Sequence, residues 1–210
     1  DQFYPSEREI LSRLSLDRTT TVLDIGCGCG GLGLALRERF DVTDYTGVEI
    51  NSLAVATAAE MNSCARFIDA DVLALSPEDL AEGAFNLVAS LSCIDWNVEF
   101  DRMLEKAWRY VRPGGHFLSS FRIVSGEGAC DMRRSFQYIN FEGRREGEIA
   151  PYVVLNARDL FTRLRVLGPA GIHAYGYWGP PSATAETPFD QICFAVVAIE
   201  KPHTDGQATY

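Results

Sequence analysis

The hydrophobic positions of the first 120 residues fall into short apolar runs, separated by segments with helical spacing. Five runs have the length and composition of buried strands, at 21–25, 45–50, 65–69, 85–90 and 116–122. The segments around them predict helices at 5–16, 31–40, 52–62 and 98–111, with a shorter helix near 76–82. Strands that alternate with helices over short connections predict a parallel, doubly wound sheet.

The first helix carries its own start signal. Ser6 is expected to be its N-cap, with Glu9 three residues later completing a capping box. The regular alternation of strands and helices then continues to about residue 124. Residues 124–151 are rich in Gly, Glu and Arg around one aromatic island, 136–141, which favours an ordered, lid-like insertion.

After this insertion the pattern predicts a helix at 156–165 and two strands, near 170–177 and 191–199. Two late strands joined by a loop indicate an antiparallel edge hairpin. We therefore expect one α/β domain over residues 1–200, built on a mostly parallel, seven-stranded sheet with helices on both faces. Residues 201–210 are expected to form a disordered tail.

A glycine-rich turn joins the first strand to the helix at 31–40. The chain reads Val-Leu-Asp-Ile-Gly-Cys-Gly-Cys-Gly from residue 22, so Asp24 precedes Gly26, Gly28 and Gly30. A strand, a turn that suits glycine and a helix N-terminus bring bare backbone up to a ligand. The spacing also satisfies the dinucleotide pattern G-x-G-x-x-G, which is a weak signal by itself.

Asp24 discriminates between two cofactors for this turn. A dinucleotide would place a doubly charged pyrophosphate beside its carboxylate, which repels that charge. S-adenosylmethionine instead presents an ammonium and a sulfonium, which a carboxylate attracts. The sequence therefore favours S-adenosylmethionine, and a nicotinamide oxidoreductase remains the alternative.

Here the chain resembles the class I S-adenosylmethionine-dependent methyltransferases, over residues 21–122. The resemblance rests on five segments in order: 22–30, Tyr45-Thr-Gly-Val-Glu-Ile50, Arg66-Phe-Ile-Asp-Ala-Asp-Val72, Phe85-Asn-Leu-Val-Ala-Ser90 and Pro113-Gly-Gly115. Asn86 departs from the family, which more often has Asp there. The resemblance implies a Rossmann-like methyltransferase fold and S-adenosylmethionine as the cofactor.

The resemblance also implies residue roles in the cofactor site. Asp24 would lie near the methionine ammonium, and Gly26 and Gly28 would let the backbone meet the cofactor. Glu49 would accept both ribose hydroxyls, Ile50 would pack on adenine, and Asp71 would accept from the adenine amino group. Gly30, Val72 and Ser90 complete the expected cofactor site.

Candidate acceptor residues follow the fourth and fifth strands, whose carboxyl ends open on the same edge as the glycine turn. Asp95 is expected to act as a base or a hydrogen-bond acceptor, and an N-cap for the helix at 98–111 is its alternative role. Trp96 offers an apolar wall. Arg122 is expected to pair with a substrate carboxylate or phosphate, with a surface ion pair as the alternative.

The insertion adds Gln137 and Tyr138, a polar and aromatic pair that suits sugar recognition. Arg133 and Arg134 are equally well explained as a solvated helical face. His116 lies at the start of its strand, at the wrong end of the sheet, so a structural role is expected. Structural packing is also the favoured role of His173.

Composition and charge limit the partners. The 210 residues are 47% hydrophobic with a net charge of −10, which fits one well-buried domain and a small-molecule substrate, and disfavours DNA. No apolar run reaches the length of a membrane span, and residues 1–6 lack a secretory pattern, so a cytoplasmic protein with reduced cysteines is expected. No metal site is expected, and the late aromatic strands offer a surface for oligomerisation.

These observations predict methyl transfer from S-adenosylmethionine to a small polar acceptor, with a sugar or sugar nucleotide favoured. Methylation of a protein or RNA group is the alternative reaction. A non-catalytic scaffold of the same fold is the alternative from another functional class.

Overall fold

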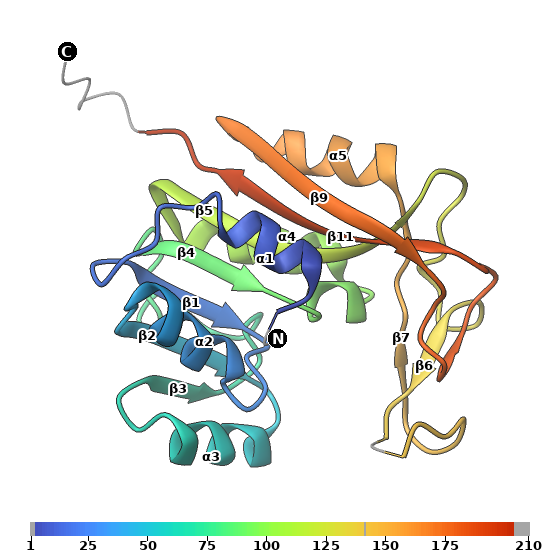
Figure 1. The fold of residues 1–210 in the computed structure, drawn as a ribbon, viewed down its shortest axis with the longest axis horizontal. Helices are drawn as coiled ribbons and strands as arrows, with labels where there is room; N and C mark the ends of the chain where they lie inside the picture. Colours follow the sequence, from blue (N-terminus) through green and yellow to red (C-terminus); the bar gives the residue numbers. More distant parts are fainter. Residues whose placement is uncertain (1–2, 141, 204–210) are drawn as a thin grey trace.

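The computed structural model describes residues 3–140 and 142–203, and its main feature is one large mixed sheet (Figure 1). The strand order is β3-β2-β1-β4-β5-β11-β9. The seven strands are β1 (Thr21–Ile25), β2 (Asp44–Glu49), β3 (Arg66–Asp69), β4 (Phe85–Ser90), β5 (Val111–Val124), β9 (Gly171–Gly179) and β11 (Ile192–Glu200). The predicted seven-stranded, mostly parallel sheet is therefore confirmed.

The first five strands of the chain are parallel, and β11 is antiparallel to both of its neighbours, β5 and β9. The edge hairpin is thus confirmed, with β9 outermost. A short strand, β8 (Leu155–Asn156), adds two residues of parallel pairing to the end of β5.

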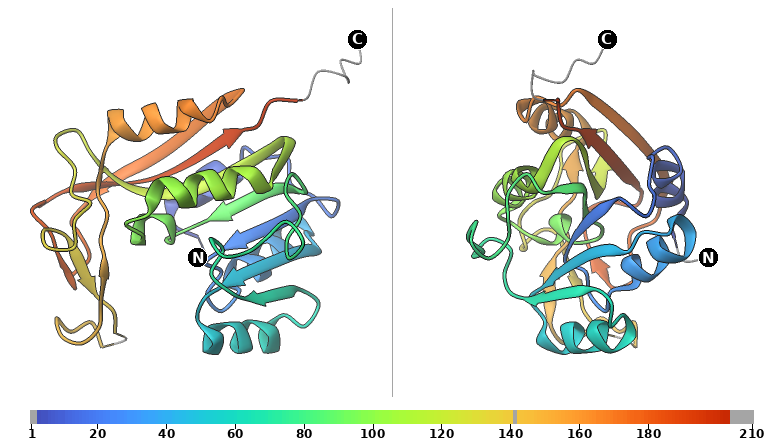
Figure 2. Two further views of the ribbon diagram at one scale, coloured as in Figure 1. Left: turned by 180° about the vertical axis from the view of Figure 1, so that it is seen from behind. Right: turned by 90° about the vertical axis from the view of Figure 1, so that its left-hand side faces the viewer.

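Helices cover both faces of this sheet (Figure 2). The helices are α1 (Pro5–Leu11), α2 (Gly31–Phe40), α3 (Ser52–Met61), α4 (Phe100–Tyr110) and α5 (Ala157–Val166), with a 3-10 turn η1 (Ile94–Trp96). The helices α1 and α2 pack on one face, α4 and α5 on the other, and α3 lies at the β3 end of the sheet. This arrangement confirms the doubly wound class.

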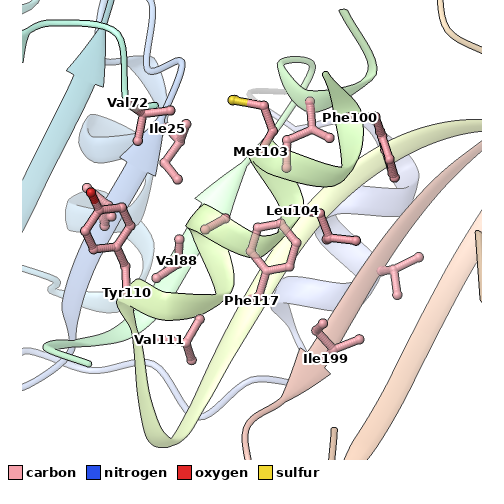
Figure 3. Packing of buried hydrophobic residues seen from close by; sticks show 14 of the residues in the cluster. Ile25, Val72, Val88, Phe100, Met103, Leu104, Tyr110, Val111, Phe117 and Ile199 are labelled. Carbon is pink, nitrogen blue, oxygen red and sulfur yellow. The ribbon is translucent and has the colours of Figure 1, made fainter. Parts of the chain in front are cut away.

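The larger core lies between α4 and the sheet (Figure 3). Met103 and Leu104 of α4 are buried against Phe117 of β5 and Ile199 of β11. The apolar positions of α4 recur at the helical spacing of three and four, so its whole inner face is apolar. This packing holds the carboxyl ends of β4 and β5 in fixed positions.

Two predicted helices differ from the structure. Residues 76–82 form turns rather than a helix. Asp79 accepts from the N–H of Ser76 as in a capping box, and one turn forms. Gly83, with φ +67°, then donates its N–H to the carbonyl of Arg109 and ends the segment there. The first helix begins at residue 5, as its predicted range did, but it ends at Leu11 rather than at residue 16, and its N-cap is Tyr4 rather than Ser6 because Pro5 opens the first turn.

The predicted insertion contributes two strands of a small second sheet. The strands β6 (Phe136–Tyr138), β7 (Ile149–Pro151) and β10 (Ala185–Glu186) pair in the order β10-β6-β7. In Figure 1 this sheet stands beyond the carboxyl ends of the parallel strands. Residue 141 of the aromatic island and residues 204–210 of the predicted tail lie outside the described residues. None of the described helices has the length and apolar character needed to cross a membrane.

Candidate active site

The glycine turn is held against the neighbouring strand. The N–H of Gly26 donates to the carbonyl of Val48 (2.8 Å), and Gly26 has φ +72°. A Cβ added there would lie 2.4 Å from Sγ of Cys93, so both conformation and space require glycine. Gly30 is the N-cap of α2 with φ +77°. The turn therefore presents backbone without side chains at this edge of the sheet.

Asp24 lies at the end of β1 and is 3% exposed. The hydroxyl of Tyr45 donates to its Oδ2 atom (2.5 Å). Burial raises the pKa of Asp24 to about 7, and the Tyr45 hydrogen bond only partly opposes this shift. A buried carboxylate with a raised pKa gains stability from a cation, so the site is chemically suited to an ammonium group.

Glu49 ends β2 and is tied to the glycine turn. Its Oε2 atom accepts from the N–H of Gly28 (3.0 Å), and its Oε1 atom accepts from the N–H of Asn51 (2.9 Å). Each oxygen keeps a second lone pair for a ligand hydroxyl. The two bonds fix the carboxylate, so Glu49 is a preorganised acceptor for a diol.

A cavity of about 380 Å³, here the β2–β3 cavity, opens at these strand ends. Its lining includes Gly26, Glu49, Ile50, Asp71 and Val72, all predicted for the cofactor. Exposed Ile50 forms an apolar surface there, and Oδ1 of Asp71 accepts from the N–H of Leu73 (2.9 Å). The sequence and the structure thus select the same residues for this cavity.

A second cavity, of about 310 Å³, lies over the glycine turn and is lined by Asp24, Gly26 and Gly31. We call it the glycine-turn cavity. Ser90, which was predicted for the cofactor, lines neither this cavity nor the β2–β3 cavity. It is fully buried at the end of β4, where its carbonyl accepts from Oγ of Ser119 (2.9 Å). The structure therefore does not bring Ser90 to the cleft.

A third cavity, of about 340 Å³, contains Asp95, Trp96, Arg122 and Gln137 and is here the arginine cavity. The Nε atom of Arg122 lies 3.4 Å from Oδ2 of Asp95, and Nη1 donates to the Asp95 carbonyl (3.0 Å). Arg122 also lies against two rings, 4.8 Å from the centroid of Trp96 and 3.8 Å from that of Tyr152. This buried, stacked pair replaces the surface ion pair considered from the sequence.

The pair leaves polar atoms for a ligand. Among the described residues, Oδ1 of Asp95 and Nε1 of Trp96 are buried without a hydrogen-bond partner. Burial raises the pKa of Asp95 to about 6, and Arg122 opposes the rise. Asp95 is not the N-cap of α4, because it sits in η1 and Glu99 occupies that position. The alternative structural role of Asp95 is therefore wrong.

Of four other residues considered from the sequence, one lines the arginine cavity and three lie outside the three cavities. Gln137 lines the arginine cavity, where its Nε2 atom donates to the hydroxyls of Ser182 and Thr184 (3.1 and 3.0 Å). Tyr138 lines none of the three cavities and packs edge-on against Phe136. His116 and His173 lie near the amino ends of β5 and β9, away from the cleft.

The three cavities share walls. Ser92 lines all three, and it is one of two described non-glycine residues with positive φ (+52°). Trp96 separates the β2–β3 and arginine cavities, and Gly26 separates the β2–β3 and glycine-turn cavities. Tyr4 and Glu7 line both the glycine-turn and arginine cavities. The three cavities therefore form one bent site that meets at Ser92. Two of the cavities can hold the two ends of one ligand, and the third can hold a second molecule.

Comparison with known proteins agrees with this geometry. Residues 22–115, which hold β1 to the start of β5, match the family model described as a methyltransferase domain. A structure of an S-adenosylmethionine-dependent methyltransferase from Methanosarcina mazei covers 96% of this chain and 99% of its own, with a TM-score of 0.69 at 18% identity. The match over residues 22–115 supports a class I S-adenosylmethionine-dependent methyltransferase, and the solved structure shares the fold.

Curated relatives match between about half and three fifths of this chain. A malonyl-[acyl-carrier protein] O-methyltransferase from Enterobacter lignolyticus is 25% identical over 62% of this chain and 49% of its own length. A trans-aconitate 2-methyltransferase from Delftia acidovorans is 29% identical over 51% of this chain and 40% of its own. The chain thus spans half or less of the length of these relatives.

Several lining residues of this cleft were not predicted from the sequence: Tyr4, Glu7, Ser92, Ser120 and Tyr152. Tyr4 is the N-cap of α1 and Glu7 lies in its first turn, and the sequence of α1 resembles that of an ordinary amphipathic helix. Ser92 lies two residues after β4. Its position just after the family-like segment at 85–90 could have identified it as a site residue. Tyr152 is brought to Arg122 by the return of the chain through β7, which no local pattern indicates.

Proposed function

We propose that the protein transfers the methyl group of S-adenosylmethionine to a hydroxyl of a small polar acceptor. The observation that carries this proposal is the meeting of three cavities at Ser92. Two of them match a nucleoside and an amino-acid end, and the third is left for the acceptor. S-adenosylmethionine, when bound, supplies a methyl group made reactive by a positively charged sulfur.

The residues of the cleft fit the cofactor. In the β2–β3 cavity, Glu49 would accept from the ribose hydroxyls, while Ile50 and Val72 would enclose the adenine and Asp71 would accept from its amino group. In the glycine-turn cavity, Asp24 would face the methionine ammonium. This division leaves the reactive end of the cofactor at the junction that borders the arginine cavity.

The charges of the arginine cavity select among acceptors. Arg122 is its one cation in the described lining, and it is already paired with Asp95, while Glu7 adds a further carboxylate. A pyrophosphate or a free carboxylate would meet these acids without a free cation. A neutral, hydroxyl-rich molecule is therefore favoured, and a sugar is favoured over a sugar nucleotide.

Asp95 and Trp96 would orient this acceptor. The unpartnered Oδ1 atom of Asp95 can accept from a hydroxyl, and the unpartnered Nε1 of Trp96 can donate to an oxygen. Gln137 adds an amide at the same wall, and Phe121 and Phe194 provide apolar surface. Polar groups at a few fixed points among aromatic side chains are typical of small-ligand sites.

The named acceptors of the relatives do not settle this choice. Malonyl groups and trans-aconitate both carry carboxylates, but those proteins match at most 62% of this chain. Methylation of RNA or protein is disfavoured because the net charge is −10 and two of the candidate acceptor residues, Asp95 and Arg122, are buried. A non-catalytic scaffold does not explain why unpartnered polar atoms of Asp95 and Trp96 lie together at the wall of one cavity.

We also propose that residues 1–200 act as one domain whose segment 124–151 closes over bound ligands. Ile139 and Ala150 line the β2–β3 cavity, and Gln137 lines the arginine cavity, so the segment borders both. The edge strand β9 exposes Tyr175 and Trp178, which offer a surface for self-association. Sedimentation velocity of the wild type and of Trp178→Ser tests self-association through β9. A wild-type protein that stays monomeric at all concentrations excludes it.

Calorimetry and a product assay test the proposed function. We expect S-adenosylhomocysteine to bind at micromolar concentrations, and no binding would contradict the proposal. A panel of methyl glycosides, matching uridine diphosphate sugars, trans-aconitate and a short RNA is then screened for S-adenosylhomocysteine formation. Turnover of the glycosides is expected, whereas exclusive turnover of an anionic acceptor or the RNA would overturn the acceptor class.

A further inference from the structure

One buried carboxylate in the cleft has no role in the cofactor or acceptor binding described above. Glu7 belongs to the first turn of α1 and is 8% exposed. It lines both the glycine-turn cavity and the arginine cavity, and no other acidic residue in the described part of the chain lines both. A side chain in this position faces the junction between the methionine end of the cofactor and the acceptor.

We infer that Glu7 is the general base that removes the proton of the acceptor hydroxyl during methyl transfer. The inference rests on the proposed function and adds the proton-accepting group and the class of acceptor. The acceptor must be a neutral alcohol with its reacting hydroxyl directed at Glu7. Asp95 then orients the acceptor, and α1 supplies the base.

The surroundings of Glu7 allow this role. Its Oε2 atom accepts from the N–H of Tyr4 (2.9 Å), which fixes the carboxylate and leaves acceptor capacity on it. Burial raises the pKa of Glu7 more than the hydrogen bond from the Tyr4 N–H lowers it, whereas Oδ2 of Asp95 faces Arg122. A carboxylate whose pKa is raised by burial gains a proton more readily than one held beside a guanidinium.

Titratable groups surround Glu7 on several elements. Tyr4 precedes it, Tyr177 approaches from β9, and Asp24 lies in the glycine-turn cavity. Asp95 and Arg122 lie across the arginine cavity. Burial raises the pKa of Glu7, which brings it closer to neutral pH, where a base is most effective.

The step balances in atoms and charge. The acceptor oxygen forms a bond to the methyl carbon as the carbon–sulfur bond breaks, and that electron pair stays on sulfur. The hydroxyl proton passes to the Glu7 carboxylate, which becomes a neutral acid and later releases the proton to water. Glu7 therefore changes charge once in each turnover.

Glu7→Gln tests the role, with Glu9→Gln as the matched control. Gln keeps the size of the side chain and can still accept from Tyr4. Glu9 lies on the same helix, pairs with Arg13 and lines none of the three cavities. We expect Glu7→Gln to bind S-adenosylhomocysteine with unchanged affinity and to lose about 100-fold or more in kcat toward the glycosides that the wild type methylates. Glu9→Gln should match the wild type.

A second readout requires no acceptor. Carbon-13 NMR of glutamate-labelled protein with bound S-adenosylhomocysteine, compared with Glu7→Gln, identifies the Glu7 carboxyl resonance. We expect this resonance to titrate with a pH midpoint above that of an ordinary glutamate. An ordinary or lower titration midpoint would overturn the inference. Unchanged kcat in Glu7→Gln, or equal losses in kcat and cofactor affinity, would overturn it as well. If the wild type binds no S-adenosylhomocysteine, the proposed function itself fails.

Discussion

The guanidinium of Arg122 lies 3.4 Å from the carboxylate of Asp95, and both side chains are at most 6% exposed. The sequence predicted separate roles for these two residues. Arg122 was expected to pair with an anionic group of the substrate, and Asp95 was expected to act as a base or a hydrogen-bond acceptor. The structure joins them in one buried unit at the back of the acceptor cavity. Arg122 therefore opposes the rise in the pKa of Asp95 that burial causes, and each side chain orients the other.

Removing the cation of this pair should destabilise the protein. We expect Arg122→Met to lower the free energy of unfolding by about 3–5 kcal/mol at pH 8, because a buried carboxylate loses its partner. The loss should be smaller at pH 5, where Asp95, with a pKa of about 6, already holds a proton. Urea unfolding at both pH values measures this. Arg163→Met, which breaks an exposed pair with Asp101, should cost less than about 1 kcal/mol.

Removing the charge of Asp95 should affect the acceptor rather than the cofactor. We expect Asp95→Asn to lower kcat/KM for the acceptor by about 10–100-fold, the value of one charged hydrogen bond. Calorimetric affinity for S-adenosylhomocysteine should stay within about twofold, since Asp95 lines only the arginine cavity. Parallel losses of cofactor affinity and turnover would place Asp95 in the cofactor site instead.

Asp24 should reduce the stability of the ligand-free protein while it strengthens cofactor binding. Its folded-state pKa of about 7 lies above the ordinary aspartate value of about 3.9, so stability falls as pH rises from about 4 to about 7. We therefore expect Asp24→Asn to unfold at higher urea at pH 8, by about 2–4 kcal/mol, with no gain near pH 4.

The same variant should bind S-adenosylhomocysteine at least about tenfold more weakly at pH 8, because the ligand ammonium loses its carboxylate. In the wild type this affinity should weaken as pH falls through about 7, and in Asp24→Asn it should not. A pH-independent wild-type affinity would contradict the placement of the ammonium beside Asp24.

Glu49 should act on cofactor affinity through its fixed carboxylate. We expect Glu49→Gln to weaken S-adenosylhomocysteine binding by about 10–100-fold, since charged acceptors bind hydroxyls more strongly than amides. Asp69→Asn is the control, because Asp69 lies opposite Glu49 in the β2–β3 register and lines none of the three cavities. Calorimetry at constant pH compares the three proteins, and equal affinities would exclude Glu49 from the cofactor site.

The glycines of the turn should differ in their tolerance of alanine. Gly26 combines positive φ with a Cβ position 2.4 Å from Cys93, Gly28 has positive φ in open space, and Gly31 has neither constraint. We expect losses of about 2–4 kcal/mol for Gly26→Ala, about 1 kcal/mol for Gly28→Ala, and none for Gly31→Ala. Urea unfolding gives this ranking, and equal losses would show that close packing is not what restricts Gly26.

Most elements of the sheet and the cofactor half were predictable from local sequence. The apolar runs predicted β1 and β4 with their observed bounds. Asp24 was found from the glycine turn that follows it, and Glu49 and Asp71 from their segments' resemblance to methyltransferase motifs at the ends of β2 and β3. The helix expected near 76–82 was wrong because Gly83, with positive φ and its N–H bonded to Arg109, ends the segment after one turn. Tyr138 packs against Phe136 and Ser90 is fully buried in the sheet, so neither side chain lines the cavities that their sequence neighbours form.

What the sequence alone determined is the strand–helix alternation, the glycine turn and the acids behind it, because these depend on local periodicity and on backbone conformations that only certain residues allow. Only the tertiary structure decided the acceptor side. There Glu7 of α1, Asp95 of η1, Arg122 of β5 and Tyr152 beyond β7 come from distant parts of the chain. Their meeting depends on how helices and a returning strand pack on the sheet, and no spacing along the chain records that packing.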